Sequence, residues 1–175
     1  EDVERLMDGK KADMVFTDPP YGMNLDTDFK KIHIKVIIQR NGSHRKVEND
    51  DVGFNRKAVL IEAKEEFWFG ADYYFDSMPK GGSWFVWDKT IGKHLGRIGN
   101  EFELCYSLRP HKRTIIRDYW VGFNGLEDED TKKRNHPTQK PVQLLVDLIE
   151  ITKSKKIIDP FLGSGSTLIA CEKTN

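Results

Sequence analysis

The chain has 175 residues, enough for one domain, and its 38% hydrophobic and 11% aromatic content is adequate for a packed core. Its 28 basic and 28 acidic residues cancel, so overall charge gives no argument for nucleic-acid binding, and any such contact must come from local patches. No apolar run approaches the roughly 18 residues that cross a bilayer, which predicts no membrane contact, and residues 1–20 do not resemble a signal peptide. Cys105 and Cys171 lack a metal-binding spacing and need not pair, which predicts no metal site and a reduced, cytoplasmic location.

The chain begins with a short predicted helix over residues 2–6 and a strand over residues 13–17, which ends in Asp18-Pro19-Pro20-Tyr21. Proline fixes its own φ, lacks an N–H group and pushes the preceding residue to extended geometry, so a rigid loop is expected. This loop presents the Asp18 carboxylate, the Pro19 carbonyl and the Tyr21 ring. Acceptors beside a stacking surface suit a planar ring that carries an amino group; an ordinary strand-end turn is the alternative.

Residues 30–46 are basic, and no carboxylate occurs between Asp28 and Glu48. Isoleucine and valine alternate with the basic side chains, which predicts a strand with one apolar and one basic face. The basic face is a candidate contact for phosphates, and a solvated strand face is the alternative.

Helix-forming residues over 55–66 predict a helix, and the aromatic run 67–70 is too short to assign by periodicity. A short helix over 73–78, closed by Pro79, is expected to pack its aromatic side chains in the core. Strands are predicted over 84–87, 103–108 and 114–121, the last two separated by the basic loop 109–113. The mixed charge run 124–135 predicts a surface loop.

An amphipathic helix follows His136 to Pro141, with leucine and isoleucine at positions 144, 145, 148 and 149 on one face. A short strand then leads through Asp159-Pro160-Phe161 to Gly163-Ser164-Gly165 and another helix. The two glycines allow close backbone approach, and the helix start offers free N–H groups, as in folds that bind a nucleoside-containing cofactor. The loop is not the full dinucleotide fingerprint.

Three motifs in this order resemble the amino-group DNA methyltransferases: Asp18-Pro-Pro-Tyr21, His136-Pro-Thr-Gln-Lys-Pro141 and Asp159-Pro-Phe-x-Gly-Ser-Gly165. The catalytic motif comes first and the cofactor motif last, which resembles the beta class of that family. The Trp84 to Lys89 stretch resembles members found in phages and beside plasmid-partition proteins. The resemblance implies S-adenosylmethionine as cofactor and DNA as partner, with a setting in restriction-modification, and it leaves a homodimer open.

The resemblance also implies the residues of the site. Asp18, Pro19, Pro20 and Tyr21 would be catalytic: Asp18 and the Pro19 carbonyl accept hydrogen bonds from the amino group of an extruded base, on which Tyr21 stacks. The cofactor would be bound by Asp159, Phe161, Gly163, Ser164 and Gly165, with Thr138, Gln139 and Lys140 near its methionine end. A helix-capping Thr138 and a solvated Lys140 are the alternatives.

The implied fold is an α/β, Rossmann-like methyltransferase sandwich that occupies residues 1–175 as a single catalytic domain. Its mostly parallel sheet contains the strands near residues 14, 84, 104, 115 and 157, and residues 103–108 and 114–121 form an antiparallel hairpin whose basic loop is a candidate DNA contact. Related enzymes bind the ribose through an acidic residue on the strand after the glycine-loop helix. The chain ends about ten residues beyond Gly165, so we expect the domain to lack its last strands.

Asp18 stands where many cytosine-N4 enzymes carry Ser and glutamine-side-chain methyltransferases carry Asn, which favours adenine N6 as the methylated position. Cytosine N4 is the close alternative. An alternative from another class is a non-catalytic DNA-binding or scaffold subunit that has kept the fold. The missing acidic strand favours that alternative, and the intact loop motifs oppose it.

Overall fold

The computed structural model describes residues 2–25, 46–59, 61–92, 100–121, 124–125 and 139–175. Most of the predicted basic strand, most of the charged run 124–135 and Thr138 lie outside the described residues, so those predictions are not addressed by the structure.

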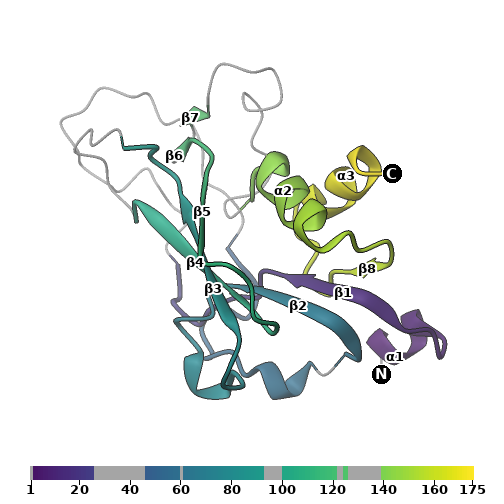
Figure 1. The fold of residues 1–175 in the computed structure, drawn as a ribbon. Coiled ribbons are helices and arrows are strands. Elements are labelled where there is room, and N and C mark those ends of the chain that lie inside the picture. Colours follow the sequence, from purple (N-terminus) through teal and green to yellow (C-terminus); the bar gives the residue numbers. More distant parts are fainter. Residues whose placement is uncertain (1, 26–45, 60, 93–99, 122–123, 126–138) are drawn as a thin grey trace.

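A six-stranded sheet with the strand order β5-β3-β4-β2-β1-β8 forms the centre of the fold (Figure 1). Strand β1 is parallel to β2 and β8, and β3 is parallel to β5, whereas β4 is antiparallel to both β2 and β3. The predicted α/β fold with a mostly parallel sheet is therefore confirmed. The strands are β1 (Ala12–Thr17), β2 (Ala63–Phe69), β3 (Ser83–Asp88), β4 (Phe102–Ser107), β5 (Thr114–Arg117) and β8 (Ile157–Ile158).

The sheet has a hydrophobic core on each face, as expected for a mostly parallel sheet. Helix α2 and helix α3 pack side by side on one face, where Met14 and Phe16 of β1 join their core (Figure 1). Val15 points to the other face, into a second core with Trp68 and Tyr74.

The helical elements are α1 (Asp2–Met7), the 3-10 turns η2 (Arg56–Ala58) and η3 (Phe75–Ser77), α2 (Val142–Thr152) and α3 (Ser166–Lys173). A small ribbon pairs β6 (Trp120–Val121) with β7 (Asn124–Gly125). None of the described helices is long and apolar enough to span a membrane.

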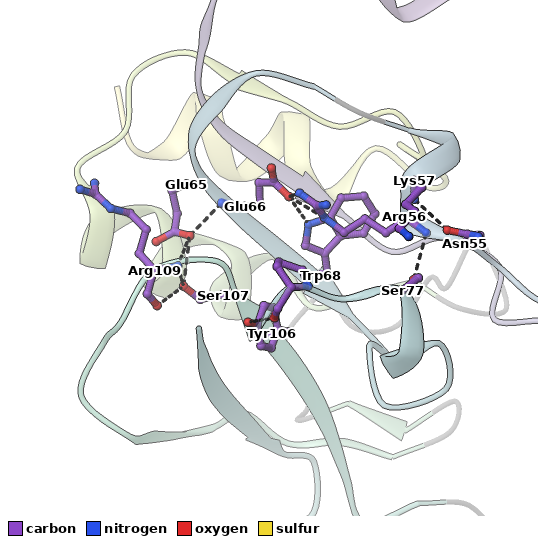
Figure 2. Close-up of polar contacts among 11 residues, drawn as sticks. Asn55, Arg56, Lys57, Glu65, Glu66, Trp68, Ser77, Tyr106, Ser107 and Arg109 are labelled. Atoms are coloured by element: carbon purple, nitrogen blue, oxygen red, sulfur yellow. Dashed lines mark hydrogen bonds and ion pairs between the residues drawn. The ribbon is translucent and has the colours of Figure 1, made fainter. Parts of the chain in front are cut away.

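The predicted helix over residues 55–66 is wrong, because this segment contains only the short turn η2 and then enters β2. Lys64, Glu65 and Glu66 are good helix formers, but β2 pairs with β1 along its length, and tertiary pairing overrides a weak local propensity. Both carboxylates are buried; that of Glu65 is held by Ser107, far along the chain, and that of Glu66 by Arg56 and Trp68 (Figure 2). Glu66 Oε2 accepts hydrogen bonds from Arg56 Nη2 at 2.5 Å and from Trp68 Nε1 at 2.8 Å.

The predicted hairpin of residues 103–108 with 114–121 is also wrong, since β3 lies between β4 and β5. The connecting loop passes the start of β3, where the His111 backbone N–H donates to Ser83 Oγ at 2.6 Å. Glu65 holds the same loop: its Oε2 lies 2.5 Å from His111 Nε2, and its Oε1 is 3.1 Å from Ser107 Oγ. Because Glu65 pairs with Met14, well before the end of β1, the basic loop lies at the opposite end of the strands from Asp18.

Candidate active site

The Asp18 and Asp159 loops meet because their strands are neighbours. Strand β8 pairs in parallel with β1, in the register Met14 to Ile157 and Val15 to Ile158, so the loops that follow both strands leave the same edge of the sheet. In α/β folds, ligands bind outside the carboxyl ends of the strands. A cavity of about 1220 Å³ lies at this edge and is lined by both loops and by Gln139 and Lys140.

Both oxygens of the Asp18 carboxylate have a partner. The Tyr21 hydroxyl donates to Oδ1 at 2.5 Å, and Lys140 Nζ donates to Oδ2 at 2.5 Å. Burial, and then the charge of Asp18, raise the pKa of Tyr21 well above its ordinary value, so its hydroxyl stays a donor. The structure thus places Lys140, expected near the cofactor, against the residue expected to hold the base.

Lys140 and Glu103 extend this contact into a row of charges. Lys140 Nζ is 3.2 Å from Glu103 Oε2, and Lys89 Nζ is 2.5 Å from Glu103 Oε1. Burial alone would lower the pKa of Lys140, but Asp18 and Glu103 raise it. Burial alone would raise the pKa of Glu103, but Lys140 and Lys89 lower it to about 2. Lys140 and Glu103 are therefore both charged at neutral pH. Sequence reasoning missed Glu103; its one signal is a carboxylate at the start of a mostly apolar predicted strand.

An aromatic pair forms one wall of the cavity. The rings of Tyr21 and Tyr73 lie stacked, with centroids 5.1 Å apart and planes at 9°. Tyr73 was expected in the core; its neighbour Tyr74 is buried there, but Tyr73 is 45% exposed and lines the cavity. An aromatic run does not show from sequence alone which ring points outward, so this residue was missed.

The backbone after Tyr21 is fixed by Asp50, a third residue that sequence reasoning missed. Its buried carboxylate accepts hydrogen bonds from the backbone N–H groups of Gly22, Met23 and Leu25, at 3.0, 3.3 and 2.8 Å. Pro19 and Pro20 also line the cavity. Tyr21 and Lys140 therefore hold the Asp18 side chain, and Asp50 holds the backbone that follows the loop.

The glycine loop has the space that a cofactor needs. Asp159 closes it by accepting from the Phe161 N–H at 3.0 Å and from Thr167 Oγ1 at 2.6 Å. Gly163 and Gly165 have φ of +53° and +81°; a Cβ at Gly163 would meet only a carbonyl oxygen at 3.7 Å, and one at Gly165 would meet nothing within 4 Å. Gly163, Ser164 and Phe161 line the cavity. These residues fit a nucleoside-containing cofactor, and the ring of Phe161 offers it an apolar contact.

Asp159 should make the stability of the protein pH-dependent. Burial raises its pKa from 3.8 to about 6, so the folded state keeps a proton that the unfolded state loses first. This group therefore destabilises the fold as pH rises from about 4 to about 6, by about 2 kcal/mol. We expect the melting temperature of Asp159→Asn, measured without cofactor, to fall less between pH 4.5 and 7 than that of the wild type.

Asp13→Asn is the matched control for that measurement. Lys64 and the backbone of Lys156 and Lys155 lower the pKa of Asp13 to about 2, so its titration lies below the tested window. The melting temperature of Asp13→Asn should therefore change with pH as that of the wild type does. If the melting temperatures of Asp159→Asn and the wild type changed with pH in parallel, a raised pKa of Asp159 in the folded protein would be contradicted.

The mostly parallel sheet, the Asp-Pro-Pro-Tyr loop and the Gly-Ser-Gly loop at adjoining strand ends together define an amino-group methyltransferase. A family model described as DNA methylase, of the N6 and N4 class, matches residues 12–175, and the chain belongs to this family. The family uses S-adenosylmethionine, which confirms the predicted cofactor.

Individual relatives are more distant. The chain is 27% identical over 177 residues to the "Putative methylase YubD" of Escherichia coli (strain K12), across 93% of this chain and 72% of that protein. The structure is similar to that of the M1.HpyAVI–SAM complex, with 20% identity, a TM-score of 0.47, and coverage of 98% of this chain and 82% of the other. For the structure of M1.HpyAVI the identity is 19% and the TM-score 0.44, with coverage of 98% of this chain and 81% of the other.

Proposed function

We propose that this DNA methylase transfers the methyl group of S-adenosylmethionine to the exocyclic N6 amino group of adenine in DNA. The observation that carries the proposal is the Asp18 carboxylate, held by Tyr21 and Lys140 at a cavity that it shares with the glycine loop. A carboxylate accepts two hydrogen-bond donors readily, and an amino group offers two. Asp at this position supports adenine over cytosine.

The site residues have distinct proposed roles. Asp18 and the Pro19 carbonyl accept hydrogen bonds from the amino group, which draws the nitrogen lone pair out of conjugation and aims it at the methyl donor. The base reaches them only when extruded from the duplex, at a cost of a few kcal/mol, and the Tyr21 wall of the cavity then contacts its ring. Asp159, Phe161, Gly163, Ser164 and Gly165 hold the cofactor, with Thr138 and Gln139 toward its methionine end.

The cofactor supplies an activated methyl group on a good leaving group. The protein therefore needs orientation more than a strong base, and well-oriented reactants can account for a large share of the rate. The two loops supply that orientation because they leave neighbouring strands at the same edge of the sheet.

Nucleoside analysis tests the proposal. The protein is incubated with S-adenosylmethionine labelled in its methyl group and with amplified DNA free of modified bases, and the DNA is digested to nucleosides. We expect the label in N6-methyladenine. Label in N4-methylcytosine would reverse the choice of base, whereas bound cofactor with no labelled DNA would favour the non-catalytic scaffold.

A further inference from the structure

We propose that Glu103 and Lys89 are positioning residues for methyl transfer, which act through Lys140 to hold the Asp18 carboxylate in one orientation. This inference rests on the proposed function, in which Asp18 receives the amino group of the base. It assigns roles to two residues that lie outside the Asp-Pro-Pro-Tyr and glycine-loop motifs.

The four residues form one row of alternating charge, Asp18, Lys140, Glu103 and Lys89. Successive contacts measure 2.5 Å, 3.2 Å and 2.5 Å. The members come from four separate places: the loop after β1, the segment before α2, strand β4, and the end of β3. The row therefore ties three strand ends and a helix start to a single carboxylate.

Burial makes each member of the row dependent on the next. The exposed fractions of the four side chains are 19% for Asp18, 10% for Lys140, 21% for Glu103 and 17% for Lys89. A charge so far out of water is costly unless it is paired, and removing one partner leaves the other uncompensated. Because the charges alternate, each inner member has an opposite charge on both sides.

Glu103 gives Lys140 a second anchor. A lysine ammonium on its flexible four-carbon stem has no fixed direction with one partner alone. Here Lys140 Nζ lies between Asp18 and Glu103, 5.2 Å from the centroid of the Phe69 ring. Lys89 Nζ lies 5.2 Å from the centroid of the Trp87 ring and holds the other oxygen of Glu103. With Tyr21 on the other Asp18 oxygen, the carboxylate is oriented before the base arrives, which is the condition for electrostatic preorganisation.

The competing role for Lys140 is a contact with the cofactor carboxylate. In the structure its ammonium already faces two carboxylates, Asp18 and Glu103, and a third anion beside Glu103 would be repelled. The two roles differ in what Glu103 does. If Lys140 positions Asp18, loss of Glu103 harms turnover; if Lys140 binds the cofactor, loss of Glu103 changes cofactor affinity.

The test compares Glu103→Gln with the wild type and with Lys64→Gln, whose exposed ion pair with Asp13 lies elsewhere on the sheet. We expect kcat of Glu103→Gln to fall about 100-fold, with cofactor Kd within about twofold, because small misplacements of reacting groups cost about that much. Lys64→Gln should match the wild type. Wild-type turnover in the same assay reports the proposed function separately.

A double-mutant cycle and a spectrum complete the test. Because Lys89 acts only through Glu103, Lys89→Met should lower kcat by itself but add little to Glu103→Gln. The Asp18 carboxyl ¹³C resonance, assigned by its loss in Asp18→Asn, should shift in Glu103→Gln and stay in place in Lys64→Gln, whether or not the protein methylates DNA. Unchanged kcat, or an unmoved Asp18 resonance, or a weakened cofactor affinity at wild-type kcat, would overturn the inference.

Discussion

Asp18→Asn should lower methyl transfer by about a thousandfold while cofactor affinity stays near that of the wild type. Asn keeps the shape of the side chain and one oxygen for the Tyr21 hydroxyl, but it replaces the oxygen that faces Lys140 with an NH₂ group. A donor then faces a donor, and the amino group of the base loses an acceptor. Losing one preorganised hydrogen-bonding group costs about 10²- to 10³-fold in kcat, and misorientation of the loop adds to this.

Single-turnover methylation and calorimetry with S-adenosylmethionine measure the two effects separately. Asp76→Asn, on the exposed turn η3, is the control and should behave as the wild type. Asp18→Ala should be equally inactive and also less stable, by about 1–3 kcal/mol, because it removes a partner from the buried Lys140 and Tyr21. Near-normal turnover by Asp18→Asn would remove Asp18 from the proposed mechanism.

The sequence predicts those parts of the site that depend on local chemistry. The prolines after Asp18 prevent β1 from continuing beyond Thr17 because they lack an N–H group, and glycines open the loop after β8 because they accept a left-handed φ. Helix α2 is likewise predicted, since the leucines at 144, 145 and 148 recur at helical spacing and are buried as expected. Each of these features is set by residues close together in the chain.

The parts that were missed depend on partners far apart in the chain. Glu65 lies buried in a central strand with its carboxylate held by Ser107 and His111, 42 and 46 residues further along the chain, and no spacing rule predicts that arrangement. Lys140 is a second example. Its motif suggests a cofactor contact, whereas the charges nearest to it belong to Asp18 and Glu103, which are distant in the chain. Strand order was missed for a related reason: β4 and β5 run in opposite directions, but β3 lies between them.

Gly70→Ala should reduce turnover about 100-fold without weakening cofactor binding. An alanine Cβ at Gly70 would lie 2.2 Å from Cζ of Tyr21, far inside van der Waals contact. The backbone cannot move away easily, because the Gly70 N–H donates to the Leu104 carbonyl at 2.9 Å and its own carbonyl accepts from the Tyr73 N–H at 3.0 Å. The Tyr21 ring must therefore shift, and with it the hydroxyl that orients Asp18 and the stack with Tyr73.

Gly9→Ala separates this clash from backbone strain. Gly9 has φ of +70°, close to the +62° of Gly70, but its Cβ would meet nothing within 4 Å. Both variants should lose about 1 kcal/mol of stability to the left-handed φ, since that conformation disfavours any residue with a Cβ. Only Gly70→Ala should also lose kcat and, through the displaced ring, about 1–3 kcal/mol of base-binding free energy, because that is the range for stacking of one base on an aromatic side chain. Equal kcat for the two variants would mean that the position of the Tyr21 ring does not govern methyl transfer, and the aromatic wall would then be structural.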